Sequence, residues 1–233
     1  MKTVIIGNKP YQNLDMSPVI DSVDENVRCN MTTVGRNNGT KYGSLALCNH
    51  LFRYLVNEPQ SEDDFWKLYQ HAYKEEEVRT FHRNYDGSKF TSVFYASPSS
   101  ALNSYLASVG CPHRFTKQPR TGYVTMIQEA IKGKKVYVTQ FTVDPTETRE
   151  TYYVQSHHFE SATHSKNDEM KVIKWLHENG HVDASMCLLL DEETPTFDCS
   201  HMKPTKEVVE MFREHFGDCN LQGIDEEHNT TKA

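Results

Sequence analysis

Short apolar segments alternate with longer amphipathic segments along most of this chain, and no other feature of the sequence constrains the fold as much. Strands that alternate with helices form a parallel sheet covered by helices on both faces, so the pattern predicts a Rossmann-like α/β fold with a mostly parallel sheet. Strands are expected at residues 3–6, 27–30, 44–48, 136–141 and 186–190. Helices are expected at residues 63–73, 99–108, 122–131, 165–179 and 205–216.

The length of 233 residues suits a single α/β domain, which we expect to comprise residues 1–143 and 164–217. Apolar and polar residues partly alternate over residues 79–97, so a strand or hairpin is expected there. Residues 144–163 are rich in Thr, Glu, Ser and His and lack apolar periodicity, which predicts a lid loop. Residues 218–233 are polar and are expected to form a flexible tail.

The composition excludes several classes of function. A formal net charge of -7 argues against a nonspecific nucleic-acid binder. No apolar stretch is long enough to span a membrane, although peripheral membrane contact stays open. The 6 cysteines are scattered and include no C-x-x-C pair, so neither a zinc ribbon nor a disulfide scaffold is indicated and a reducing cytoplasm is expected. The chain also lacks the glycine-rich motifs of dinucleotide and ATP binding.

Asparagine ends or follows three of the expected strands. Gly7 and Asn8 follow the first strand, Asn30 ends the second, and Asn49 follows the third. Ligands of open α/β sheets bind at the carboxyl ends of strands, where glycine would let a phosphate or ribose approach the backbone. Each asparagine taken alone is an ordinary turn residue. Together they predict one pocket lined by amide donors and acceptors.

Arg120, Thr121 and Gly122 come directly before or at the start of an expected helix. Thr121 is expected to cap that helix, and its hydroxyl with the free backbone N–H groups from Gly122 onwards would form an anion site. Arg120 would supply a positive charge for a phosphate. A plain capped helix explains the same residues equally well.

His164 stands just outside another helix whose two ends are marked in the sequence. Ser165 is expected to be its N-cap with Asp168 as partner, and Gly180 is expected to end it. The positive end of the helix dipole disfavours imidazolium, and a neutral, fixed imidazole suits a general base. A solvated surface histidine is the alternative. A metal site with His157 and His158 is disfavoured, because adjacent ligands point in different directions and no acidic partner has helical spacing.

Taken in this order, the segments resemble two groups of sialyltransferases: the bacterial lipooligosaccharide enzymes and the animal Golgi enzymes with their L, S and VS motifs. VIIGN at 4–8 and VRCN at 27–30 look like the L motif, and NGTK at 38–41 resembles its end. PRTG at 119–122 resembles the opening of the S motif. His164 with Glu169 is similar to the VS motif, and HSKN at 164–167 looks closer to the bacterial sequence around the catalytic histidine.

The resemblance implies a variant GT-A glycosyltransferase that moves sialic acid from CMP-sialic acid to a sugar hydroxyl by metal-independent, inverting transfer. Its partners would be a CMP-sugar donor and a glycan acceptor, with no cofactor. His164 would be the general base, and the lid tyrosines Tyr152 and Tyr153 would stabilise the leaving phosphate. The nucleotide sugar would be bound by the residues already named at the strand ends and at the expected helix start, namely Gly7, Asn8, Asn30, Asn49, Arg120, Thr121 and Gly122.

The chain also departs from these families. The bacterial pattern has a tyrosine three residues before the histidine, where this chain has Ser161. The animal enzymes have an L-to-S disulfide, a membrane anchor and a stem that this sequence lacks, so a compact cytoplasmic enzyme is the expected match. Two alternatives stay open. The donor could be another CMP-activated acidic sugar such as Kdo, or the chain could be a non-catalytic relative that binds a nucleotide or glycan.

Overall fold

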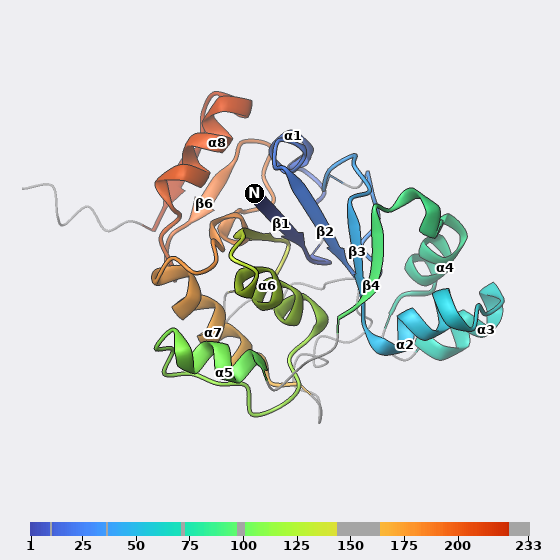
Figure 1. The fold of residues 1–233 in the computed structure, drawn as a ribbon. Coiled ribbons are helices and arrows are strands. Elements are labelled where there is room, and N and C mark those ends of the chain that lie inside the picture. The colour runs from blue at the N-terminus through green and yellow to red at the C-terminus, as the bar shows by residue number, and fades with distance from the viewer. Residues whose placement is uncertain (10, 36, 71–72, 97–100, 144–163, 224–233) are drawn as a thin grey trace, which may run out of the picture.

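A five-stranded parallel sheet forms the centre of the protein (Figure 1). The computed structural model describes residues 1–9, 11–35, 37–70, 73–96, 101–143 and 164–223. The strand order is β4-β3-β2-β1-β5, and each neighbouring pair is parallel. Because the chain proceeds from β1 to β4 in one direction and then returns to place β5 on the other side of β1, the sheet has a switch point between β1 and β5. The strands are β1 (Lys2–Ile6), β2 (Glu25–Cys29), β3 (Ser44–Leu47), β4 (Ser92–Tyr95) and β5 (Lys135–Thr139).

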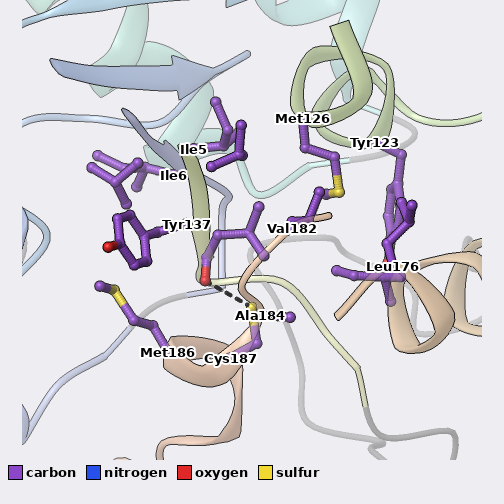
Figure 2. Close-up of a cluster of buried hydrophobic side chains, with 14 of the residues drawn as sticks. Ile5, Ile6, Tyr123, Met126, Tyr137, Leu176, Val182, Ala184, Met186 and Cys187 are labelled. Atoms are coloured by element: carbon purple, nitrogen blue, oxygen red, sulfur yellow. Dashed lines mark hydrogen bonds between the residues drawn. The ribbon is translucent and has the colours of Figure 1, made fainter. Parts of the chain in front are cut away.

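Helices cover both faces of this sheet, as the alternation in the sequence predicts. Helix α6 (Thr121–Ile131) contacts β1, β3 and β5 on the face to which Ile5 points. The 3-10 helix η4 (Ser185–Leu188) lies on the other face, where Met186 packs near Tyr137 (Figure 2). Helix α1 (Ser17–Asp21) connects β1 to β2. The expected α/β fold class is therefore confirmed.

The remaining helices lie around the edges of the sheet. In Figure 1, α3 and α4 lie beyond β4, whereas α7 and α8 lie on the β5 side. A second, two-stranded parallel sheet pairs β6 with β7. The bounds of these elements are α2 (Asn49–Phe52), the π-helix η1 (Arg53–Asn57), α3 (Glu62–Tyr69), α4 (Glu75–Asn84), the 3-10 helix η2 (Gly87–Lys89), α5 (Ala101–Ser108), α7 (Lys166–Glu178), β6 (Thr196–Asp198), α8 (Lys206–Phe216) and β7 (Asn220–Gln222).

Two expectations about the elements need correction, and a third, for residues 79–97, is confirmed in part. The apolar run 186–190 is not a strand, because η4 covers most of it and buries Met186, Cys187 and Leu188. The interval 79–97 holds the end of α4 as well as the strand β4, and β4 pairs in parallel with β3 instead of forming a hairpin. Part of the expected flexible tail is β7, whose Gln222 carbonyl accepts a hydrogen bond from the backbone N–H of Cys199 at 2.8 Å. The expected lid, residues 144–163, lies outside the described residues.

Helix α7 begins and ends where its sequence predicts. The Ser165 hydroxyl accepts a hydrogen bond from the Asp168 backbone N–H at 3.3 Å, and Gly180, with φ of +74°, follows the helix end. The Asp168 carboxylate also accepts a hydrogen bond from the Thr116 backbone N–H at 2.9 Å. This contact ties the start of α7 to the segment that leads into α6. None of the helices among the described residues is long and apolar enough to cross a membrane.

Candidate functional site

A pocket lies at the carboxyl ends of β1, β2 and β5, beside the first turns of α6 and α7. It holds about 620 Å³ of space, part of it open to solvent. Its position next to the switch point between β1 and β5 is the usual ligand site of an open α/β sheet. The described residues that line it are Gly7, Asn8, Lys9, Cys29, Asn30, Arg120, Thr121, Gly122, Tyr123, Gln140, Phe141, Thr142, Lys166 and Met170.

Most of the residues expected to bind a nucleotide sugar line this pocket. Gly7, Asn8 and Asn30 come from the strand ends, and the three residues 120–122 come from the start of α6. Asn49 does not line it and is an exposed residue at the start of α2. The reason is the strand order, because β3 lies one strand further from the switch point than β2. Tyr152 and Tyr153 lie outside the described residues.

The two pocket asparagines are held in place by hydrogen bonds within the protein. Asn8 Nδ2 donates to the Cys29 carbonyl at 3.1 Å, and Asn8 Oδ1 accepts from the Thr32 hydroxyl at 2.6 Å. Asn30 has φ of +54°, a left-handed conformation that asparagine tolerates better than most residues, and its Oδ1 accepts from the Cys48 backbone N–H at 2.8 Å. Each side chain therefore keeps its orientation, and the Asn30 amide N–H groups have no partner among the described residues.

The two pocket glycines serve close packing within the protein, which the sequence did not predict for either. A Cβ on Gly7 would lie 2.3 Å from the Gln140 carbonyl oxygen. A Cβ on Gly122 would lie 2.1 Å from Cε1 of Phe141. Both distances are far inside van der Waals contact, so glycine is required for β1 and α6 to approach the segment after β5. Gly7 therefore allows a close approach of the chain to itself, and it also lines the pocket, where the expected approach of a ligand stays a prediction.

The start of α6 is capped by a residue that is distant in the sequence. Thr121 is the first helical residue and not the N-cap, and Arg120 holds the N-cap position without a side-chain cap. The fully buried carboxylate of Glu169 takes that role, because its Oε1 accepts a hydrogen bond from the Arg120 backbone N–H at 2.7 Å. Its Oε2 lies 2.9 Å from Arg120 Nη2, close enough for an ion pair although not aligned as a hydrogen bond. The Arg120 charge is thus matched within the protein.

The groups that line the pocket favour the binding of an anion. The backbone N–H groups of Thr121 and Gly122 belong to the first turn of α6, where intrahelical acceptors are lacking and the helix dipole is positive. Lys9 and Lys166 add positive charge beside the pair that Arg120 makes with Glu169. No carboxylate belongs to a described lining residue of this pocket. Helix N-termini with such neighbours bind phosphate and carboxylate groups.

His164 lies two residues before Lys166, which lines the pocket. Its Nδ1 is 2.7 Å from the Gln118 carbonyl oxygen. Because a carbonyl only accepts, Nδ1 must carry the proton, and Nε2 of the neutral ring carries the lone pair. Partial burial lowers the pKa of His164, and the positive charges of Arg120 and Lys117 lower it further against the raising effect of the hydrogen bond to Gln118. The ring is therefore neutral at pH 7, as a base must be.

The sequence did not single out Lys9, Gln140 and Lys166 as site residues, although each lines the pocket. A signal existed for Lys9, because it closely follows an expected strand at the same edge of the sheet as Asn8, whereas Gln140 lay inside the strand expected at 136–141 and follows β5 only because β5 ends at Thr139. Lys166 is the first residue of α7 and follows the N-cap directly. Its position at the pocket depends on the packing of α7 beside α6, which the sequence alone does not reveal.

Comparisons with known proteins found similarity to solved structures and none to family models or curated sequences. No model of a known protein family matches the sequence, and no curated protein matches it. A solved structure described as "Crystal Structure of a Mammalian Sialyltransferase" is similar at 17% identity and a TM-score of 0.45, covering 78% of this chain and 67% of that chain. A second, described as "Crystal Structure of a Mammalian Sialyltransferase in complex with Gal-beta-1-3GalNAc-ortho-nitrophenol", is similar at 13% identity and a TM-score of 0.43 with the same coverage. At these values the similarity establishes neither a substrate nor an activity for this chain.

Proposed function

We propose that this protein is a glycosyltransferase that moves sialic acid from CMP-sialic acid to a sugar hydroxyl, with inversion and without a metal. One observation carries the proposal. The three segments that resemble sialyltransferase motifs are far apart in the sequence, yet each contributes lining residues to one pocket: Asn8 and Asn30 from the first, Thr121 from the second, and from the third Lys166, two residues after His164. If these short motifs resembled the family only by chance, there would be no reason for their residues to lie at the same pocket.

The groups around the pocket suit a nucleoside monophosphate that is linked to an acidic sugar. The N–H groups of Thr121 and Gly122 would receive the phosphate, which carries a full negative charge. Lys9 and Lys166 would balance the remaining negative charge, including a sugar carboxylate. The fixed amides of Asn8 and Asn30 would bind the neutral hydroxyls and carbonyls of the nucleoside.

His164 would act as the general base. Its Nε2 would take the proton of the acceptor hydroxyl while that oxygen forms a bond to the anomeric carbon of the donor sugar. The bond between the anomeric carbon and the phosphate oxygen breaks on the opposite face, and its electron pair leaves with CMP. A positioned base of this kind contributes about 10²- to 10⁴-fold to the rate. Donors aimed at the leaving phosphate would add electrostatic stabilisation, and Tyr152 and Tyr153 are proposed for that role.

A donor test separates this function from its two alternatives. Purified protein is incubated with CMP-sialic acid or CMP-Kdo in the presence of EDTA, with and without a panel of glycan acceptors, and CMP release and glycan products are measured. We expect acceptor-dependent CMP release from CMP-sialic acid. Turnover of CMP-Kdo alone would assign a different acidic sugar. CMP binding without release from either donor would indicate a non-catalytic binder, and activity that EDTA abolishes would contradict metal independence.

A further inference from the structure

Gln140 has a buried side-chain amide that the described protein does not satisfy. It follows β5 directly, lines the pocket and is only 3% exposed. Its Nε2 is buried and has no hydrogen-bond partner among the described residues. Buried amides are nearly always hydrogen-bonded, because leaving such a donor unpaired is unfavourable. An unpaired donor that lines a pocket therefore points to a ligand.

The backbone at Gln140 is also held in an unfavourable conformation. Its φ is +61°, in the left-handed region that residues other than glycine, asparagine and aspartate rarely adopt. The segment after β1 holds it there, because the Lys9 N–H donates to the Gln140 carbonyl at 3.0 Å and the Gly7 N–H donates to Thr139 at 2.9 Å. The missing Cβ of Gly7 leaves the space that the Gln140 carbonyl occupies. Two segments of the chain thus cooperate to keep this side chain at the pocket.

A neutral amide suits a neutral acceptor. The phosphate of a nucleotide has its own donors in the first turn of α6 and in Lys166. The amide of Gln140 carries no charge and is withdrawn from solvent, so it better matches the carbonyl oxygen or ring nitrogen of a base. If the hydrogen bond between them is lost, one buried polar group is left unpaired on the protein and one on the base. We propose that Gln140 binds the nucleoside part of the donor, with Nε2 donating to an acceptor atom of the pyrimidine. The identity of the ligand rests on the function proposed above.

This role predicts opposite effects on stability and on binding. Gln140→Met keeps the length of the side chain and removes the unsatisfied amide, so the ligand-free protein should melt at a higher temperature than the wild type. The same variant should bind CMP and cytidine about 3- to 10-fold more weakly, by the same factor for both, because the lost bond is to the nucleoside. A glutamine with only a structural role would instead lower the melting temperature when replaced and leave the affinity unchanged.

The experiment measures melting temperature and calorimetric affinity for CMP and for cytidine. Gln70→Met, an exposed glutamine at the end of α3, is the matched control and should change neither quantity. Equal affinity of Gln140→Met and the wild type for cytidine would overturn the inference, as would a loss that is confined to CMP. In wild-type protein, the side-chain amide resonance of Gln140 should shift on addition of cytidine, and an unchanged resonance would overturn the inference even where the variant does not fold. A wild-type protein that binds neither compound would instead refute the proposed function itself.

Discussion

Gly122→Ala tests how closely α6 packs against the segment after β5. Alanine is up to about 1 kcal/mol more favourable than glycine within a helix, so the substitution would stabilise the protein if the space were open. The new Cβ would, however, lie 2.1 Å from Cε1 and 2.4 Å from Cζ of Phe141. Normal carbon contacts are about 3.5 to 4.0 Å, so the ring or the helix must move by roughly 1.5 Å.

The cost of that movement sets the expected magnitude. Overpacking a well-packed site costs about 1–3 kcal/mol, which outweighs the gain in helix propensity. We therefore expect Gly122→Ala to lower the free energy of unfolding by up to about 2 kcal/mol. In a Phe141→Ala background the clash is gone, and the same substitution should be neutral or stabilising. The coupling energy between the two sites should thus be at least about 1 kcal/mol, within the range measured for contacting residues.

The assay is urea unfolding of the wild type, the two single variants and the double variant. Gly133→Ala is the control for a glycine with no atom near its Cβ position, and its φ of +74° should make it destabilising by the same amount in both backgrounds. CMP affinity is measured for each folded variant; Gly122→Ala and Phe141→Ala, alone or together, should weaken it, whereas Gly133→Ala should not. Equal effects of Gly122→Ala with and without Phe141 would refute the close packing at this edge of the pocket.

Three further predictions concern the pocket and the chemistry. Asn30→Gly keeps a backbone suited to φ of +54° but removes the amide, so calorimetry should show CMP binding weakened by about 0.5–1.5 kcal/mol, whereas Asn49→Gly should leave it unchanged. Because the pKa of His164 is lowered in the folded protein, the neutral base persists to lower pH. The acid limb of the pH profile of kcat/KM should therefore have its midpoint below pH 6.5, the usual pKa of histidine. A midpoint above that value would contradict the assignment of His164 as the base. If Tyr152 or Tyr153 stabilises the charge that develops on the leaving phosphate, its change to Phe should lower kcat more than it affects KM. Unchanged kcat in both variants would contradict that role.

In β2 the buried Arg28 separates Val27 from Cys29, but β1, β3 and β5 could be predicted from sequence because each contains a short apolar run, as expected for buried parallel strands. The same property led to the wrong prediction of a strand at residues 186–190, because a fully buried apolar run has no periodicity that distinguishes a strand from a 3-10 helix. Helix α4 was missed for a different reason. It buries only Val78 and Phe81, and its first turn is a run of three glutamates that resembles a solvated charge cluster.

The site was predicted where a local rule applies and missed where long-range packing decides. The position of Asn8 and Asn30 at strand ends was enough to place both at the pocket. The cap on α6 comes from Glu169, which is 49 residues from Arg120, so no local pattern could reveal it. Gln140 was missed because the expected strand ran to residue 141, whereas β5 ends at Thr139, and because its left-handed backbone depends on contacts with the segment after β1.

The most direct test of this account is transfer from CMP-sialic acid by His164→Ala, measured together with its affinity for CMP. His164 does not belong to the described lining of the pocket, and it stands outside α7, so the variant should fold and bind CMP as the wild type does. Loss of the base at Nε2 should slow transfer by about 10²- to 10⁴-fold. Transfer at the wild-type rate by a folded, CMP-binding His164→Ala protein would contradict the proposed mechanism.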